Sequence, residues 1–395
     1  MLNEKNLKNI KNILQMVQMK HLKDFENWGI NKRKKETAIN SLINIIQNDG
    51  EKLDYFKEWI SIFTIDGHNN YYVFNYNDSD LELEDLKNIV EDIVSENLLE
   101  IDTSDLEETK VIYKKNDAIN KRLIIRFISP ALISCKNENE NGNIESGLEK
   151  TFYFATLFLD LSLKQIIVSI PHTVGIKSID NIEAKARDFS EIAKYYVSKL
   201  EDLLTTYNIQ IEKYNDWIYD ATYELAEEGS AHNNPEINKK YEENIDKIDE
   251  FAKKIAIASG ITDKAIIENF KEGVGILYEN ILIDEFGVVE DENQYSTFVQ
   301  NGDGVNSYCR VGSKTATLKS GKGHAIAKTS RNNEDVKNLG VMKSFNGTLS
   351  RFLIEVLDKE LYLIRTDTSK FIEERVIYDV IRKVGEYKYT FRKSE

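Results

Sequence analysis

Residues 121–128 read KRLIIRFI and residues 152–159 read FYFATLFL, and these two stretches decide the fold of the chain. Both are mostly apolar and rich in β-branched or aromatic side chains, which is typical of strands in the middle of a sheet. Asp160 to Leu163 form the expected turn into the next strand. The sequence therefore predicts a central, mostly antiparallel sheet with strands near 109–114, 122–135, 151–160 and 164–170.

Helical periodicity is found on both sides of this sheet. Apolar side chains recur at three- and four-residue spacing in 3–27, in 36–48 and from Asp80 to about residue 97. The pattern from Ile179 onward is again helical, and it predicts helices at 180–207, 212–228, 236–257 and 263–283. Gly273 and Gly275 lie within the last of these, where they allow close helix packing or a kink.

Turn signals predict further strands near both ends of the chain. Asp66-Gly67 lies between β-type runs at 61–65 and 71–74, which is the pattern of a hairpin. Beyond residue 293, glycines separate short β-type pieces that predict a β-meander with Lys322 at a tip. The remaining segments are expected to form a hairpin at 349–357 and 361–365, a helix at 369–384 and a strand at 386–392.

These elements predict an α+β fold with N-terminal helices, the central sheet, an acidic helical region and a small C-terminal α/β part. The length of 395 residues is enough for two domains or for one large domain with an appendage. The expected segments are an N-terminal helical segment, a mainly β α+β domain, an acidic helical region and a basic α/β region, at 1–60, 61–178, 179–290 and 291–395.

The composition predicts a folded protein in a reducing compartment. Hydrophobic residues make up 41% of the chain and charged residues 30%, which excludes wholesale disorder. Cys135 and Cys309 have no spacing that indicates a disulfide framework or a cysteine-ligated zinc site. The N-terminal segment has the pattern of an amphipathic helix, and no stretch approaches the roughly 18 apolar residues of a membrane span. We therefore expect a cytoplasmic protein that does not insert into membranes.

Charge is distributed unevenly along the chain. The formal net charge is −15, but residues 1–50 carry +4, residues 51–303 carry −26 and residues 304–395 carry +7. No Asp or Glu occurs between Gly304 and Asn333. The candidate phosphate-binding residues in this segment are Arg310, Lys314, Lys319, Lys322, His324, Lys328 and Arg331. A surface with cations and no carboxylates binds polyanions, because each neutralised phosphate releases counterions.

The leading prediction is a non-catalytic nucleic-acid-binding protein that contacts phosphates through the C-terminal meander. Its composition is compatible with a phage, mobile-element or antiviral-defence system. The competing interpretation of the same cations is a solvated strand edge, since lysines on an exposed edge also prevent aggregation. A second alternative is an interaction scaffold, or an acidic DNA-mimic inhibitor, that contacts a protein partner through the acidic helices at 180–290.

The sequence favours a non-catalytic protein but leaves an enzyme open. Gly321-Lys322 is not a P-loop, because Ala316 stands where the first glycine is required and Gly323 where Ser or Thr is required. A metal-dependent nuclease needs an Asp on one strand and a Glu-x-Lys nearby, which Asp160 and Glu183-Ala184-Lys185 supply. His172 follows a predicted strand and is the histidine expected to face a cleft. No cofactor and no metal site are predicted.

Overall fold

The computed structural model describes residues 2–391 apart from 32, 64, 78–80, 139–143, 174, 186–187, 208, 214–215, 304–307, 315, 334, 358 and 367–370. The described residues form helices and antiparallel strands, which confirms the predicted α+β class. The chain divides into two compact units: residues 1–213 with 369–379, and residues 214–368 with 380–395. The four segments expected from the sequence divide the chain more finely and stay a prediction.

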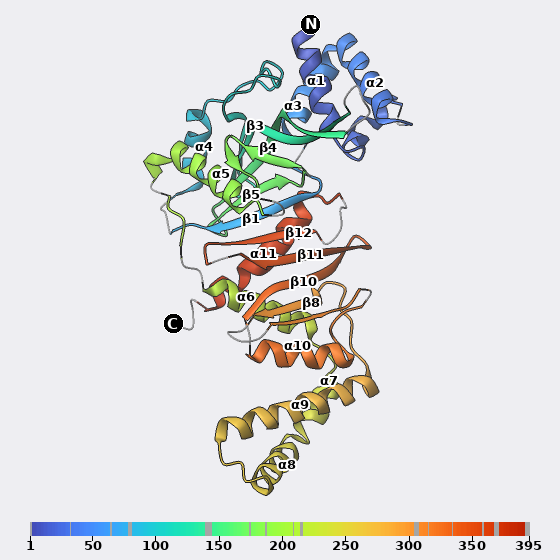
Figure 1. Ribbon diagram of the computed structural model, residues 1–395, viewed down its shortest axis with the longest axis vertical. Helices are drawn as coiled ribbons and strands as arrows, with labels where there is room; N and C mark the ends of the chain where they lie inside the picture. The colour runs from blue at the N-terminus through green and yellow to red at the C-terminus, as the bar shows by residue number, and fades with distance from the viewer. Residues whose placement is uncertain are drawn as a thin grey trace. The chain divides into compact units, whose positions relative to one another are not determined.

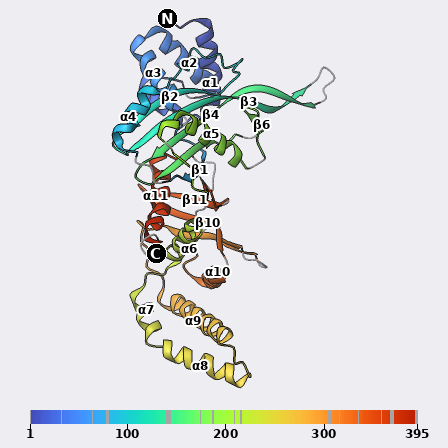
Figure 2. The same ribbon diagram turned by 90° about the vertical axis from the view of Figure 1, so that its left-hand side faces the viewer.

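The first unit is built on a sheet in which two long strands are central. Its strands are β1 (Asn69–Asn75), β2 (Lys110–Asp117), β3 (Arg122–Glu138), β4 (Ile144–Asp160), β5 (Gln165–Pro171), β6 (Ile176–Ile179) and β7 (Ile182–Glu183). The order is β7-β6-β3-β4-β5-β1, and β2 also pairs with β3. The β3–β4 pair is continuous from Arg122 opposite Asp160 to Glu138 opposite Ile144, and Figure 2 shows it extending past its neighbours. The central position predicted for the two apolar stretches is confirmed.

Helices pack on both faces of this sheet. They are α1 (Glu4–Met16), the 3-10 helix η1 (His21–Trp28), α2 (Lys35–Asn48), α3 (Gly50–Ile62), α4 (Leu83–Asp92), α5 (Ser190–Leu203) and the 3-10 turn η2 (Thr205–Tyr207). Both faces are covered, since Arg126 of β3 contacts the α3 end and the neighbouring Phe127 contacts α5. Side chains of α1, α2 and α3 pack with Phe152 and Phe154 of β4 in one hydrophobic core. Arg126 of β3 is fully buried in this sheet, with its guanidinium 4.4 Å from the ring centre of Phe154. Burial lowers the pKa of Arg126 to about 9.

Two sequence predictions in this unit are wrong. The hairpin predicted for 61–65 and 71–74 is not formed by the described residues, because α3 continues to Ile62 and β1 pairs with β5 instead, and residue 64 lies outside the described residues. Phe56, Trp59, Ile60 and Phe63 continue a helical spacing that packs into the core.

The predicted helix at 180–207 begins only at Ser190. Asp180 and Asn181 both adopt positive φ in the turn of the β6–β7 hairpin. Positive φ at both turn residues suits a tight two-residue hairpin, and Asp and Asn tolerate that conformation better than most residues.

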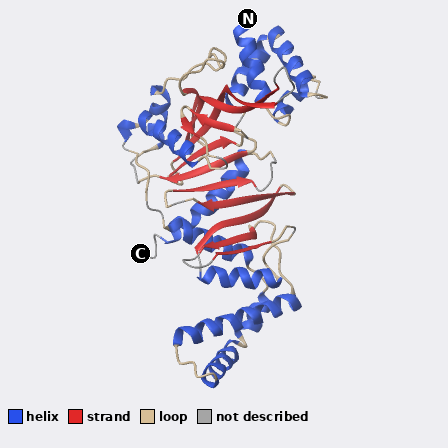
Figure 3. Cartoon of the chain, viewed as in Figure 1, coloured by secondary structure: helices blue, strands red, loops and turns tan. Residues whose placement is uncertain are grey.

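The second unit contains a five-stranded antiparallel sheet with helices against it. The strands are β8 (Ser296–Asp303), β9 (Tyr308–Gly312), β10 (Asp335–Phe345), β11 (Thr348–Val356) and β12 (Leu361–Thr366), in the order β12-β11-β10-β8-β9. The helices are α6 (Trp217–Ser230), α7 (Pro235–Glu242), α8 (Ile245–Ala258), α9 (Lys264–Phe286), α10 (Gly321–Asn333) and α11 (Glu374–Phe391), of which α11 begins in the first unit. Helix α6 packs against β8 and β10 (Figure 3). The predicted hairpin at 349–357 and 361–365 is confirmed as β11 and β12.

The predicted basic β-meander is wrong beyond its first strand. Residues 321–333 form helix α10 instead of a glycine-tipped strand pair. His324, Ala327 and Arg331 are buried at three- and four-residue spacing, so burial against the sheet outweighs the poor helix propensity of Gly321 and Gly323.

The predicted final strand at 386–392 is also wrong, because α11 continues to Phe391. Tyr387 donates a hydrogen bond to Glu228 of α6, which holds this end of the helix. None of the helices in the described part of the chain combines the length and apolar character that a bilayer crossing requires.

Candidate functional site

The seven side chains predicted to contact phosphates do not form one surface. The structure buries Lys319, His324 and Arg331, leaves Lys328 half-buried, and exposes Arg310, Lys314 and Lys322. Four of the seven side chains therefore do not contribute to the contiguous, solvent-facing patch that the prediction requires. The buried members contact carboxylates that come from other parts of the second unit.

Arg331 is a structural link between α10, α6 and β8. Its guanidinium donates to Glu227 Oε2 from Nε at 3.0 Å and from Nη2 at 2.5 Å. It also donates to Gln300 Oε1 at 2.9 Å and to Ser230 Oγ at 3.1 Å. A guanidinium with these partners has its donors turned inward and does not present them to a phosphate.

Glu279 of α9 gathers three further basic side chains. Lys328 Nζ lies 2.7 Å from its carboxylate, His232 Nε2 lies 3.6 Å away and His324 Nε2 lies 3.9 Å away. Burial alone raises the pKa of Glu279, but the hydrogen bond from Lys328 and the nearby charges of Lys328 and His324 lower it to about 2. Burial lowers the pKa of His232. This cluster holds α9 against α10, and its cations are compensated within the protein.

Lys319 is the most buried lysine among the predicted residues. Its side chain is 1% exposed and its Nζ donates to Glu290 Oε2 at 3.1 Å, whereas Glu290 is more than half exposed. The lysine therefore neutralises a surface carboxylate from beneath and has no access to a polyanion.

Arg310, Lys314 and Lys322 are the predicted cations that remain exposed. Arg310 lies on β9, the last strand in the order of this sheet, and Lys314 follows the same strand. Within the described residues, none of the three side chains has a carboxylate partner. Their position fits the alternative that the sequence left open, a strand edge protected by cations.

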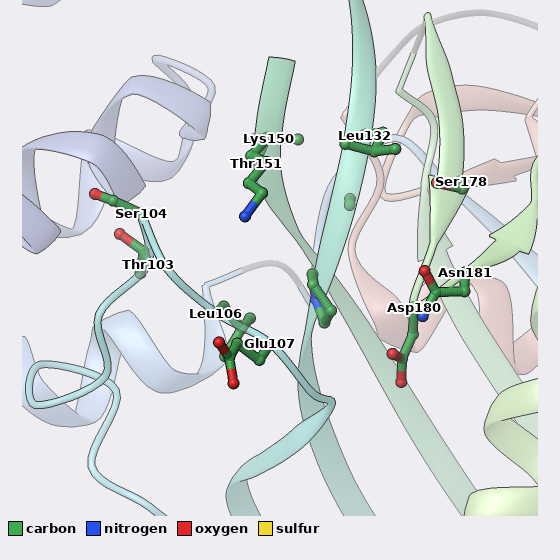
Figure 4. A pocket seen from close by; sticks show the side chains of 12 residues that line it. Thr103, Ser104, Leu106, Glu107, Leu132, Lys150, Thr151, Ser178, Asp180 and Asn181 are labelled. Carbon is green, nitrogen blue, oxygen red and sulfur yellow. The ribbon is translucent and has the colours of Figure 1, made fainter. Parts of the chain in front are cut away.

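A polar pocket of about 300 Å³ lies on the sheet of the first unit. Figure 4 shows Lys150 and Thr151 on one strand, Leu132 on the neighbouring strand, and Asp180 beyond it. The Asp180 carboxylate accepts hydrogen bonds from the hydroxyls of Thr109, at 2.8 Å, and Tyr195. Asp180 is held by these two hydroxyls, whereas Lys150 and Glu107, which also line the pocket, are exposed.

A smaller cleft of about 100 Å³ contains the histidine that the sequence analysis selected. His172 follows β5, and its ring centre lies 5.2 Å from that of His68, which precedes β1. Burial lowers the pKa of His68, and the charge of His172 lowers it further. His21 Nδ1 accepts from the Gln18 amide at 3.2 Å, so its Nε2 carries the proton and donates to the Asp66 carbonyl oxygen at 2.9 Å.

The other residues of the predicted nuclease site lie apart. Glu183 of β7 pairs with Ser178, which pairs with Leu132 of β3, whereas Asp160 of β4 pairs with Arg122 of β3. Ten residues of one strand separate those two positions, which is about 33 Å at the usual rise per residue. Asp160 instead accepts from the turn amides that follow it. No group of three metal-ligating side chains was found in the described residues.

The α8–α9 region of the second unit exposes apolar side chains that the sequence did not lead us to expect at the surface. Helices α8 and α9 pack together as a hairpin, and α10 lies on the sheet side of α9 (Figure 1). Large apolar side chains of this hairpin are exposed, and on α8 they are Ile245, Phe251, Ile255 and Ile257. On α9 they are Ile266, Phe270, Leu277, Ile281 and Phe286. Exposed apolar side chains mark an interaction site where they lie together on one face.

Asp263 precedes helix α9, and its carboxylate caps the first turn by accepting from Ala265 N and Ile266 N. One face of the helix packs on α7 and α8. There Lys271 pairs with Asp249 at 3.0 Å, and a side chain at Gly275 would collide with the Tyr241 hydroxyl. The close packing predicted for Gly275 is confirmed.

A second face of α9 contacts α10. Glu279 pairs with Lys328, and Glu272 accepts a hydrogen bond from Asn332. The third face has no covering element among the described residues. On it lies the α9 stripe, which we define as Ile266, Phe270, Gly273, Leu277 and Ile281.

The α9 stripe is straight and continuous. Steps of four, three, four and four residues keep its members within about 80° of the helix circumference and along about 22 Å of its axis. The four large side chains are 39–64% exposed, and the space in front of Gly273 is open. This geometry is typical of a helix that packs against another helix.

Sequence reasoning missed this surface although part of its signal was present. Helix 263–283 was predicted, and its apolar residues occur on all sides of the helix rather than on one. A helix that is apolar all round is either buried or interacts with a partner. The structure was needed to show that two of its faces are covered and one is not. Compared with known proteins, the sequence matches no family model, and no curated protein shows significant similarity to it.

Proposed function

We propose that this chain is a non-catalytic protein-interaction module, and that its α8–α9 hairpin binds an apolar α-helix of a protein partner. The α9 stripe is the observation that carries this proposal, since its four large apolar side chains are exposed in one line. Helix-to-helix docking is the recognition mode for which such anchors at three- and four-residue spacing are suited.

The buried cations support the same conclusion indirectly. Lys328 and Arg331 help to hold α9 and α6 against α10, so they fix the base of the hairpin. A hairpin anchored in this way presents its free face with little loss of conformational entropy on binding. The acidic region 180–290 that was expected to contact a protein partner contains this hairpin.

Cysteine labelling inside cells tests the proposal. In a chain with Cys135→Ser and Cys309→Ser, Leu277→Cys reports on the α9 stripe, and Ile119→Cys reports on a turn residue that is 94% exposed. We expect a membrane-permeant maleimide to label position 277 at least about tenfold more slowly than position 119 in the cells that make the protein, because a partner covers the stripe. Equal labelling rates would show that nothing binds there, and the proposal would fall.

Polyanion binding through Arg310, Lys314 and Lys322 is the second candidate, favoured by their exposure without carboxylate partners among the described residues. Three phosphate contacts give a weak, salt-dependent affinity. Fluorescence anisotropy with a labelled single-stranded and a labelled duplex oligonucleotide tests it. Binding that falls with salt and disappears when all three residues are changed to Glu supports this candidate, and binding that survives the change contradicts it.

A cytoplasmic location, a phage, mobile-element or antiviral-defence setting, and a DNA-mimic role of the acidic helices stay predictions from composition. The mimic interpretation draws no support from Glu279, because Lys328 neutralises this carboxylate within the protein.

A further inference from the structure

We propose that the partner of the α9 stripe is the same stripe of a second copy of this chain, packed antiparallel about a two-fold axis between Gly273 and Val274. This inference rests on the function proposed above and names the partner. The spacing of the exposed apolar residues along α9 supports it.

The four large side chains of the α9 stripe are symmetric about that point. Phe270 and Leu277 each lie three and a half residues from the midpoint between Gly273 and Val274, and Ile266 and Ile281 each lie seven and a half residues from it. In an antiparallel pair, Phe270 therefore faces Leu277 of the second copy, and Ile266 faces Ile281. A surface that matches itself in this way is what a two-fold symmetric interface requires.

Gly273 fits the centre of such an interface. Nothing in the described structure lies within 4 Å of the position that a side chain there would occupy, so Gly273 does not serve packing within the chain as Gly275 does. At a helix crossing, a missing side chain lets two axes approach toward the short end of the usual 8–10 Å range. The large residues on either side of Gly273 then interlock.

Charge also favours a second copy at this location. The whole chain carries −15, so two copies repel each other over most of their surface. Residues 266–281, which span the α9 stripe, hold one lysine and three carboxylates, a net charge of −2, and Lys328 of α10 pairs with one of the three, Glu279. This segment therefore carries little of the charge that makes two acidic chains repel each other.

The size of the stripe sets the expected affinity. A contact about 22 Å long and one helix wide is smaller than the roughly 800 Å² per partner of a standard stable interface. We therefore expect a reversible dimer with a Kd on the order of 10 µM.

Sedimentation velocity of the purified full-length chain between 1 and about 200 µM, on either side of that Kd, tests the inference. We expect the mass to rise from that of the 45.6 kDa monomer toward twice that value. Leu277→Glu should weaken dimerisation at least about tenfold, because it places a carboxylate in the apolar contact. Ile119→Glu, an equally drastic change at an exposed position in the first unit, should leave it unchanged.

Disulfide trapping determines the direction of packing. In the chain without native cysteines, a mixture of Phe270→Cys and Leu277→Cys chains should form the mixed disulfide much faster than either variant forms a disulfide with itself. A monomer at every concentration, a dimer that survives Leu277→Glu, or like-to-like disulfides would each overturn the inference. If the purified chain stays monomeric while position 277 is protected in cells, the self-association inference falls and the proposed interaction function stands.

Discussion

In both the segment 304–333 and the α8–α9 hairpin, the side chains that reach solvent differ from those that the sequence suggests. The first has no carboxylate of its own, but the structure buries Lys319 and Arg331 against carboxylates from elsewhere. The second contains many charged residues, but its free face on α9 is apolar. A local excess of charge therefore does not identify a binding surface. What identifies it is which side chains remain without partners after packing.

Replacing Arg331 should have the largest effect on stability among the basic residues of the segment 304–333. Arg331→Ala should lower the free energy of unfolding by about 3 kcal/mol, because Glu227, Gln300 and Ser230 lose their common donor. Arg310→Ala, in the same basic segment but exposed on β9, should change it by less than about 0.5 kcal/mol. Urea denaturation monitored by hydrogen exchange in α10 measures both. Equal effects of the two variants would mean that Arg331 is not the structural link described here.

Acidification tests whether the Glu279 cluster holds α9. The folded-state pKa of Glu279 is lowered to about 2, so its stabilisation is present above about pH 4.5 and is lost as the pH falls toward 2. The lowered pKa of His232 adds a loss as the pH falls below about 6.5, since folding disfavours its protonation. We expect about 2 kcal/mol to be lost between pH 5 and 3.

Glu279→Gln is the control for that titration. This variant should remove the pH dependence below 4.5 and retain the component from His232. Hydrogen exchange of the α9 amides as a function of pH measures both chains. The same acid-induced loss in the variant would show that another carboxylate is responsible.

Replacing Lys319 tests whether a buried cation always stabilises the fold. Lys319→Met keeps the length of the side chain and removes its charge, and Glu290 is exposed enough to be solvated alone. We expect a change within about 1 kcal/mol in either direction, because the loss of the ion pair with the solvated Glu290 is offset by removing the cost of burying the lysine charge. Arg331→Met is the matched exchange and should cost about 3 kcal/mol. A similar large loss at both positions would contradict the distinction.

A substitution in the α9 stripe should have the smallest effect on the free energy of unfolding. Leu277→Glu should change the free energy of unfolding of the monomer by less than about 0.5 kcal/mol, since Leu277 is 62% exposed. Ile283→Glu, on the same helix but buried, should destabilise the second unit by several kcal/mol because it places a charge in the packed side of α9. Measurements at low protein concentration keep dimerisation out of the comparison. A large loss from Leu277→Glu would show that the stripe is covered within the chain.

The sequence predicted the β3–β4 pair, β5, the β11–β12 hairpin and helix α9 well, because each has a local run or spacing of apolar residues that is typical of its secondary structure. It missed α10, because two glycines in this segment indicated turns. The helical spacing of His324, Ala327 and Arg331 became visible only when the structure showed that all three are buried. For the candidate site, the sequence selected the basic segment and His172. It did not reveal that His68 lies beside His172, since the two are held together only by the pairing of β1 with β5.

The fold class and the central strands follow from local sequence patterns, since neighbouring residues share the apolar runs and spacings that lead to burial. Which charges and which apolar side chains reach solvent depends instead on the tertiary packing. Glu279 is 49 residues from Lys328, and Glu227 is 104 residues from Arg331. Neutralisation over such separations depends on how the helices pack against the sheet, and so does the free face of α9. These are properties of the three-dimensional arrangement that no local pattern records.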